Sequence, residues 1–153
     1  MANEFLQIEV NKISQDGRWA FPLNLAMTAA YVMAHFKGEN LKILDMTNKS
    51  SLCDFNILAT AQNVMQARSM ADELASQFRA IGTNVRSMEG YGSADWILID
   101  TGDVIVHIFQ EGTRDLYALD IVFAEAATVA IPSEFYFSGP VGKTQEENLK
   151  GFF

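Results

Sequence analysis

Two short apolar runs joined by a turn place the strongest constraint on how this chain of 153 residues folds. Residues Trp96–Ile99 and Val104–Phe109 are rich in β-branched and aromatic side chains, which favour strands. Between them, Asp100-Thr101-Gly102-Asp103 has the composition of a tight turn. Together these segments predict a β-hairpin. Because side chains alternate along a strand, successive residues of each run are expected on opposite faces of a sheet.

Three other stretches are expected to be helices, the first because Ala, Leu and Met dominate it and the other two because their apolar residues form a stripe on one face. They are residues 23–37, 64–81 and 114–127. Asn63 is placed to cap the second of these helices and Gly82 to end it. The third helix is expected to turn one apolar stripe toward the core, formed by Leu116, Leu119, Val122, Phe123 and Ala126.

Strands are predicted over residues 41–46, 54–60 and 84–88, and residues 5–10 are a further candidate for a short strand. The strand at 54–60 reaches the next one through a helix, which indicates a parallel crossover, whereas the hairpin adds an antiparallel pair. The order of elements therefore predicts an α/β fold: a mixed β-sheet of about five strands flanked by helices.

The length fits one domain of ordinary size. We expect an N-terminal extension over residues 1–22, an α/β domain over residues 23–137, and a flexible C-terminal tail over residues 138–153. Regular structure is expected to end at Ile131-Pro132, and the tail is rich in glycine.

The formal net charge of −8 argues against a protein that grips nucleic-acid phosphates, so little direct nucleic-acid contact is expected. The acidity either serves a basic protein partner or only keeps the chain soluble. A single cysteine, Cys53, excludes an intramolecular disulfide and favours a reducing, cytoplasmic location. Residues 1–10 are unlike a signal peptide, and the apolar stretch 21–36 is too short for a membrane span, so no membrane association is expected.

The sequence contains few motifs that support catalytic chemistry. The segment Gly90-Tyr91-Gly92-Ser93 is not a dinucleotide fingerprint, and no P-loop occurs. Asp100 and Asp103 are better placed to close the turn by bonds to the backbone than to hold two metal ions. His107 is expected to be a partly buried structural residue, since no metal-ligand spacing joins it to another histidine. We therefore predict no catalytic residue, no metal and no cofactor.

Residue types that often serve function surround the hairpin: Glu89, Trp96, Asp100, His107, Arg114 and Tyr117. Tryptophan, tyrosine and arginine dominate binding hot spots, so Trp96, Arg114 and Tyr117 indicate an interaction surface. An equally weighted alternative places Trp96 and Tyr117 in the core and pairs Arg114 with an acid such as Glu89 or Asp115.

Three blocks of the sequence resemble the ribosomal silencing factor family, also called Iojap-like proteins. The first block contains residues 41–46 and Asp54–Thr60. The second contains Glu89-Gly90 and residues 96–100. The third and most specific is Gly102-Asp103-Val104-Ile105-Val106-His107-Ile108-Phe109, followed by Arg114 and residues 116–120. The resemblance runs from about residue 23 to residue 132. It departs from the family pattern at Ala61-Gln62-Asn63, Gly112 and Val122-Phe123.

The resemblance implies a translational repressor that binds the large ribosomal subunit through its fourteenth protein, a basic ribosomal protein, and blocks joining with the small subunit when nutrients are short. It implies a fold like that of nucleotidyltransferases but without their catalytic aspartates. It also implies that two copies of the chain can associate as a homodimer. Glu89, Trp96, Asp100, Arg114 and Tyr117 are the residues expected to form or border the contact. Two other classes stay open: a metal-dependent nucleotidyltransferase-like enzyme, and a homodimeric scaffold with an unrelated partner.

Overall fold

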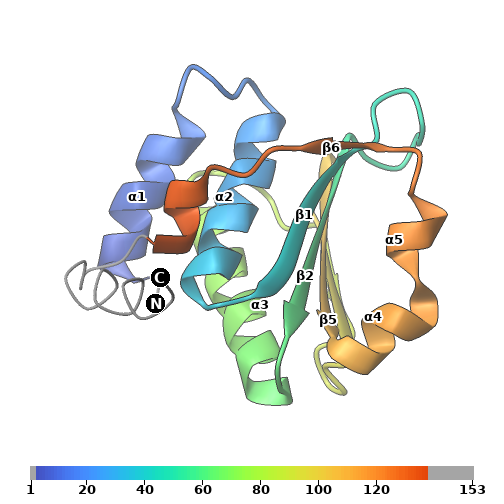
Figure 1. Ribbon diagram of the computed structural model, residues 1–153. Helices are drawn as coiled ribbons and strands as arrows, with labels where there is room; N and C mark the ends of the chain where they lie inside the picture. The colour runs from blue at the N-terminus through green and yellow to red at the C-terminus, as the bar shows by residue number, and fades with distance from the viewer. Residues whose placement is uncertain (1–2, 138–153) are drawn as a thin grey trace, which may run out of the picture.

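The computed structural model describes residues 3–137, which form a mixed sheet with helices on both faces (Figure 1). The sheet has six strands in the order β3-β4-β5-β2-β1-β6. The strands are β1 (Glu39–Asp45), β2 (Phe55–Ala61), β3 (Ser87–Glu89), β4 (Trp96–Asp100), β5 (Val104–Gln110) and β6 (Ala127–Val129). The helices are α1 (Glu4–Ser14), α2 (Leu23–His35), α3 (Val64–Ala80), α4 (Glu111–Tyr117), α5 (Leu119–Val122) and the 3₁₀ helix η1 (Ser133–Phe137).

One face of the sheet is covered by α1, α2 and α3 (Figure 1). We call it the closed face. Ten of the thirteen residues of α2 are buried, and α3 turns a stripe that includes Leu74 and Phe78 into the same core. The large core beneath these helices takes Val104, Val106 and Ile108 from β5. This face therefore contains most of the apolar area whose burial stabilises the fold.

The hairpin prediction is confirmed. β4 and β5 pair antiparallel, with Trp96 opposite Phe109 and Asp100 opposite Ile105. The Asp100 carboxylate closes the turn by accepting a hydrogen bond from the Gly102 backbone N–H at 2.7 Å. The side-chain bond expected from Asp103 is not found among the described residues; its backbone carbonyl instead accepts from the Asp54 N–H at 2.8 Å and ties the turn to the start of β2. The mixed sheet flanked by helices is confirmed as well, with six strands instead of about five.

The two strands joined by the expected crossover, β2 and β3, have the predicted parallel orientation but are not neighbours in the sheet. β2 and β3 run parallel, yet β5 and β4 lie between them, and the strand that pairs in parallel with β2 is β5. The cap expected at Asn63 is confirmed, because its side-chain oxygen accepts from the Gln66 N–H at 2.8 Å. Gly82 follows the helix with φ +82°, a conformation that favours glycine.

The strand considered for residues 5–10 is wrong: this segment belongs to helix α1. The Asn3 side chain caps the helix by accepting from the N–H groups of Phe5 and Leu6. Leu6, Val10 and Ile13 follow helical spacing and are buried against α2 and α3. The N-terminal extension is thus part of the core along residues 4–14.

Two expectations about the C-terminal part are also wrong. The single helix over 114–127 is divided into α4 and α5, and regular structure continues past Pro132 into η1, whose Phe135 is buried against Trp19 and Tyr31. Strand β6 forms in addition and pairs with β1. The tail predicted at 138–153 lies outside the described residues. Within residues 3–137, no helix is both long and apolar enough to cross a membrane.

Candidate partner-binding face

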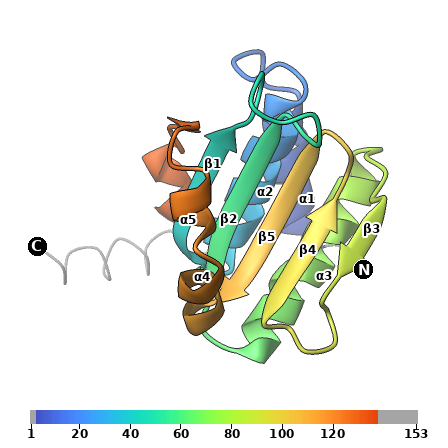
Figure 2. The ribbon, with the colours of Figure 1, turned by 90° about the vertical axis from the view of Figure 1, so that its right-hand side faces the viewer.

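The second face of the sheet, which we call the open face, has much less cover than the first. Figure 2 looks onto it: α4 and α5 lie in front of β1 and β2, whereas β5, β4 and β3 have no described helix before them. Alternation along the strands places Trp96, Leu98 and Asp100 of β4 on this face. Trp96 and Leu98 are half-buried there, although both are large and apolar.

Four rings meet on the open face, and we call them the Trp96 cluster: Trp96, His107, Phe109 and Tyr117. The indole centroid lies 5.0 Å from the Phe109 ring and 4.7 Å from the Tyr117 ring. Phe109 is fully buried beneath, whereas Tyr117 is 51% exposed. The cluster therefore runs from the interior to the surface, with Trp96 between its buried and its exposed members.

Gly90 permits the loop before β4 to approach Trp96. Its φ is +81°, and a Cβ atom at this position would overlap the carbonyl oxygen of Trp96. Arg68 of α3 supports the same loop by donating from Nε to the Tyr91 carbonyl at 3.1 Å, and its guanidinium also bonds the Gly92 carbonyl. The loop that leads into β4 is thus held in a defined position next to Trp96.

A line of hydrogen bonds connects the surface indole to the interior. The Trp96 Nε1–H donates to His107 Nδ1 at 3.1 Å, and His107 Nε2 lies 3.0 Å from Asn56 Oδ1. The thiol of Cys53 donates to the same Asn56 oxygen at 3.6 Å. Burial lowers the pKa of His107 to about 4, because the charged ring would lose its hydration. His107 is therefore the buried, satisfied histidine that was predicted, in its neutral form at pH 7.

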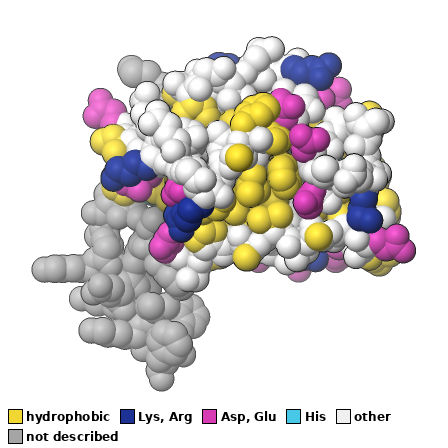
Figure 3. Space-filling model, turned by 90° about the horizontal axis from the view of Figure 1, so that it is seen from above, with side chains coloured by type: hydrophobic (Ala, Val, Ile, Leu, Met, Phe, Trp, Pro, Cys, Tyr) yellow, Lys and Arg dark blue, Asp and Glu magenta, His cyan; other side chains and the backbone are white. Residues whose placement is uncertain are grey.

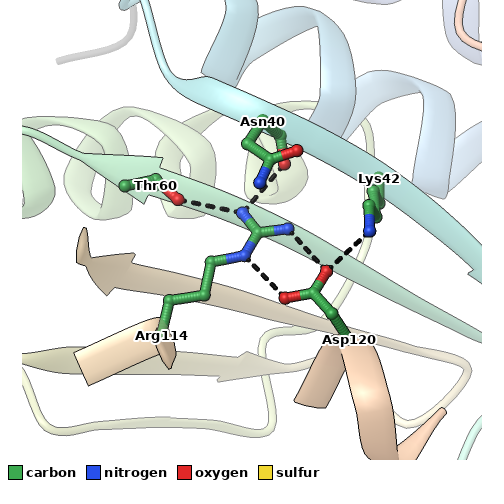
Figure 4. A network of polar contacts seen from close by, with 5 residues as sticks. All are labelled: Asn40, Lys42, Thr60, Arg114 and Asp120. Atoms are coloured by element: carbon green, nitrogen blue, oxygen red, sulfur yellow. Dashed lines mark hydrogen bonds and ion pairs between the residues drawn. The ribbon is translucent and has the colours of Figure 1, made fainter. Parts of the chain in front are cut away.

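Arg114 does not lie on the surface. Its side chain is 4% exposed and points between β1, β2 and α5 (Figure 4). Nε and Nη2 donate to the two carboxylate oxygens of Asp120, each at 3.0 Å, while Nη1 donates to the Asn40 carbonyl and the Thr60 hydroxyl at 2.8 and 2.9 Å. Lys42 adds an ion pair to Asp120 at 2.9 Å. The expected pairing of Arg114 with Glu89 or Asp115 is thus replaced by a pairing with Asp120.

Asp120 is the anion at the centre of this network. The Arg114 guanidinium, with help from Lys42, holds the pKa of the Asp120 carboxyl well below its usual range. In a continuous helix, residues six apart lie about 120° apart around the axis and about 9 Å apart along it, so Arg114 and Asp120 meet only because the helix breaks between them. The break is at Ala118, which has φ +51° and ψ +41°. The ion pair fastens α5 across the end of β1 and β2.

The broken helix leaves four apolar side chains in solvent: Leu116, Tyr117, Ile121 and Val122, exposed by 78, 51, 77 and 65%. We call them the apolar ridge. Leu119 and Phe123, from the same predicted stripe, do pack on the smaller core under α5. Beside the ridge, a hollow of about 550 Å³ lies between α5 and residues 46–50. An exposed apolar group of this kind, next to a half-buried tryptophan, is typical of an interaction surface.

The five residues predicted for partner binding are not all brought together. Trp96 and Tyr117 are in contact, and Glu89 is on the edge strand β3 in the same face, opposite Leu98. Asp100 is at the far end of β4, roughly 14 Å along the strand from Trp96. Arg114 is interior. The structure therefore joins two of the predicted residues directly and places the other three around or beneath them.

Acidic side chains surround this part of the molecule. Exposed Glu89 and Asp95 lie before and after the loop that precedes β4, and Glu111 and Asp115 are exposed on α4. Figure 3 shows the other end of the molecule, seen from above the view of Figure 1; there too, hydrophobic side chains gather in the middle of the surface and acidic ones lie beside them. Apolar area with a negative rim is complementary to a partner that is both apolar and basic.

Neither a metal-binding group nor a reactive thiol is found among the described residues. Among residues 3–137, no group of three or more histidine, cysteine, aspartate or glutamate side chains is placed to hold a metal ion. Burial, with the nearby Asp100 and Asp54 carboxylates, raises the pKa of the Cys53 thiol to about 11, so that it is a poor nucleophile at neutral pH.

Several contacts and exposed residues of the site were not predicted from the sequence. Asn56 and Asp120 were not linked to His107 and Arg114, because these contacts join distant strands or cross a break in a helix. Leu116 and Val122 were placed in the core, since no glycine or proline marks the break at Ala118. One signal of the exposed apolar side chains was available in the sequence. The segment has many apolar residues although it also contains Glu111, Asp115, Asp120 and Glu125.

Comparisons with known proteins agree with this architecture. The family model described as "Ribosomal silencing factor during starvation" matches residues 22–150. The ribosomal silencing factor RsfS of Halalkalibacterium halodurans is 34% identical over 95 residues, which cover 62% of this chain and 81% of that protein. The RsfS protein of Haemophilus influenzae is 36% identical over 88 residues, covering 58% and 86%.

A crystal structure of a Bacillus halodurans protein superposes with a TM-score of 0.62 at 31% identity, covering 70% of this chain and 96% of that one. The family match extends over the whole sheet and both of its faces, from the start of α2 past the end of η1. The chain therefore belongs to the ribosomal silencing factor family.

Proposed function

We propose that this protein silences translation in the cytoplasm by binding the large ribosomal subunit and blocking its joining with the small subunit, especially under nutrient limitation. The contact is with a basic ribosomal protein, the fourteenth of the large subunit. Family membership supports the ribosomal role. The observation that carries the choice of surface is the Trp96 cluster, which reaches solvent beside the apolar ridge on the less covered face of the sheet.

Within this proposal, Trp96 is the anchor. It is half-buried in the free protein, held by ring contacts and by a hydrogen bond, so little rotamer freedom is left to lose on binding. Tyr117 enlarges the apolar contact, and Glu89 supplies negative charge at its border. Asp100 shapes the hairpin turn, and Arg114 acts from beneath by fastening α5. Since the net charge is −8, the contact avoids ribosomal RNA and uses protein.

Co-sedimentation with purified large subunits tests this assignment. Truncation of a central aromatic anchor costs roughly 2 kcal/mol or more, so Trp96→Ala is expected to weaken binding at least about 30-fold. Tyr117→Ala, at a more exposed ring, is expected to weaken it less. Phe21→Ala is the matched control, because Phe21 is an aromatic side chain with 65% exposure in the loop before α2. A folded Trp96→Ala protein with unchanged affinity would remove Trp96 from the contact.

Blocking of subunit joining is measured separately. Purified small and large subunits are mixed with increasing amounts of the protein, and the fraction of joined ribosomes is read from a sucrose gradient. The parent is expected to lower this fraction in proportion to its occupancy of the large subunit, and Trp96→Ala to require a correspondingly higher concentration. Binding without any loss of joining would contradict the steric part of the proposal.

A further inference from the structure

The line Trp96–His107–Asn56 has only one arrangement of protons that satisfies all its members. An indole Nε1–H is a donor and never an acceptor, so His107 Nδ1 must carry the lone pair. The ring proton then lies on Nε2 and is donated to Asn56 Oδ1, which also accepts from Cys53. Asn56 thus selects the tautomer of His107, and His107 supplies the acceptor that the indole needs.

The surroundings of His107 keep this arrangement fixed. The rings of Trp96 and Phe109 flank it from β4 and β5, and Leu44 and Leu58 share its apolar cluster from β1 and β2. The α5 side contributes Leu119 and Phe123, which are apolar. The titratable groups facing the site are the Cys53 thiol, which reaches Asn56, the Tyr117 phenol across Trp96, and Glu89 on the same face from β3. The one carboxyl group among these three, Glu89, lies on the exposed edge strand.

We propose that His107 and Asn56 are positioning residues for partner recognition: Asn56 fixes the His107 tautomer, and the free Nδ1 of His107 holds the Trp96 indole in its binding orientation on the open face. This inference rests on the proposed function, because it assigns the source of the anchor's orientation. A tryptophan that is partly exposed has room to turn outward toward water, and ring contacts alone tolerate several tilts. The hydrogen bond from Nε1 selects one of them.

A pair of substitutions at His107 separates positioning from packing. In His107→Asn, the side-chain oxygen occupies about the place of Nδ1 and still accepts from Trp96. In His107→Leu, a side chain of comparable volume fills the buried site but offers no acceptor. Binding to large subunits is expected to fall about tenfold for His107→Leu and by much less for His107→Asn. A role in packing alone predicts the opposite order, since leucine suits a buried apolar site better than asparagine does.

Substitution Asn56→Asp gives a second, independent readout. A carboxylate about 3 Å from Nε2 raises the pKa of His107 and favours the doubly protonated ring. Nδ1 then carries a proton that faces the Trp96 N–H, so the hydrogen bond is lost. Binding by Asn56→Asp is expected to weaken as the pH is lowered from 8 to 6, while the parent keeps its affinity. The double variant Asn56→Asp/His107→Asn is the control and is expected to show no pH dependence.

Fluorescence follows the indole without any ribosome. Trp19 and Trp96 are the two tryptophans of the chain, so Trp19→Phe leaves Trp96 as the one reporter. In that background, His107→Leu is expected to shift the emission to longer wavelength, as the indole turns toward water, and His107→Asn to leave it near the parent value. If the parent does not sediment with large subunits, the proposed function fails, and this fluorescence comparison still decides whether His107 orients Trp96. The inference is overturned if His107→Asn and His107→Leu behave alike in fluorescence and, where the parent binds, in binding. It is also overturned if the parent binds large subunits and Asn56→Asp binds with an affinity that does not change with pH.

Discussion

The closed and open faces of the sheet are made from alternate residues of the same strands but are completed differently. On the closed face, three helices bury a continuous apolar core that includes Ile57, Val106 and Phe78. On the open face, the buried set is smaller and is interleaved with polar groups, Asn56, His107 and Arg114, each of which has hydrogen-bond partners. The first face stabilises the fold mainly by apolar packing, whereas the second also uses directional bonds to hold particular side chains in place.

Under the proposed function, this difference separates stability from recognition. Loss of a closed-face side chain is expected to lower the fraction of folded protein without changing what the folded protein binds. Loss of an open-face polar group is expected to cost less stability and to alter the positions of Trp96, Tyr117 and α5. Four measurements test this separation.

The largest expected effect is on the closed face. Phe78 is fully buried in α3, and Phe78→Ala should lower the free energy of unfolding by about 3–5 kcal/mol, because it removes apolar contacts and leaves a cavity. Urea denaturation measures this value. Affinity for large subunits per folded molecule should stay at the parent level. A loss below about 1 kcal/mol would show that the closed face is less tightly packed than described.

The next effect comes from the pH dependence of His107. The folded-state pKa is about 4 and the ordinary value is 6.5, so the unfolded chain binds the proton first as the pH falls. Stability is therefore full above about pH 6.5 and decreases toward pH 4, by up to about 3 kcal/mol. Urea denaturation of the parent and of His107→Leu from pH 7 to 4 isolates this contribution, since other groups titrate in both. Parallel curves for the two proteins would contradict a neutral buried imidazole.

A smaller effect is expected at the ion-pair network. Asp120→Asn leaves the buried Arg114 charge with only neutral acceptors and should lower the free energy of unfolding by about 2–3 kcal/mol. Lys42→Met removes a partner that is itself 38% exposed and should cost about 0–1 kcal/mol. Chemical denaturation of both variants gives the comparison. Equal losses would mean that Arg114 is not the dominant partner of Asp120.

The smallest effect on stability is expected at the apolar ridge. Leu116 is 78% exposed, so Leu116→Ser should change the free energy of unfolding by no more than about 0.5 kcal/mol while it weakens binding to large subunits. Met65→Ser is the control, because Met65 is 79% exposed on α3, away from the open face. If both variants bind as the parent does, the ridge lies outside the contact.

Elements with a strong local pattern were predictable from the sequence. The hairpin has β-branched runs around a turn, and α3 has an apolar stripe between Asn63 and Gly82, so each segment's local preference agrees with its place in the fold. The alternation in β5 likewise placed His107 and Phe109 on the face opposite Val106. Trp96 and Tyr117, which were singled out because they bracket the hairpin in sequence, are in contact in the structure.

The wrong predictions fall on segments whose local pattern fits both a strand and a helix, or in which no glycine or proline marks a helix break. Residues 5–10 alternate only partly, as in a short strand, and Leu6, Val10 and the later Ile13 follow the helical period. The segment 114–127 has no glycine or proline, so nothing local indicates the left-handed Ala118. That conformation costs about 1–2 kcal/mol and persists because the Arg114–Asp120 pair and the packing of Leu119 and Phe123 offset it.

Local pattern was thus sufficient for the α/β class, the hairpin and the face on which its side chains point, because period and turn chemistry act over a few residues. The tertiary structure alone decided which side chains meet on that face and which stay exposed. It brought Asn56 to His107, Asp120 to Arg114 and Tyr117 to Trp96, and it left Leu116 and Ile121 in solvent. These outcomes depend on which strands become neighbours and where a helix breaks, and both are settled by the packing of the whole chain.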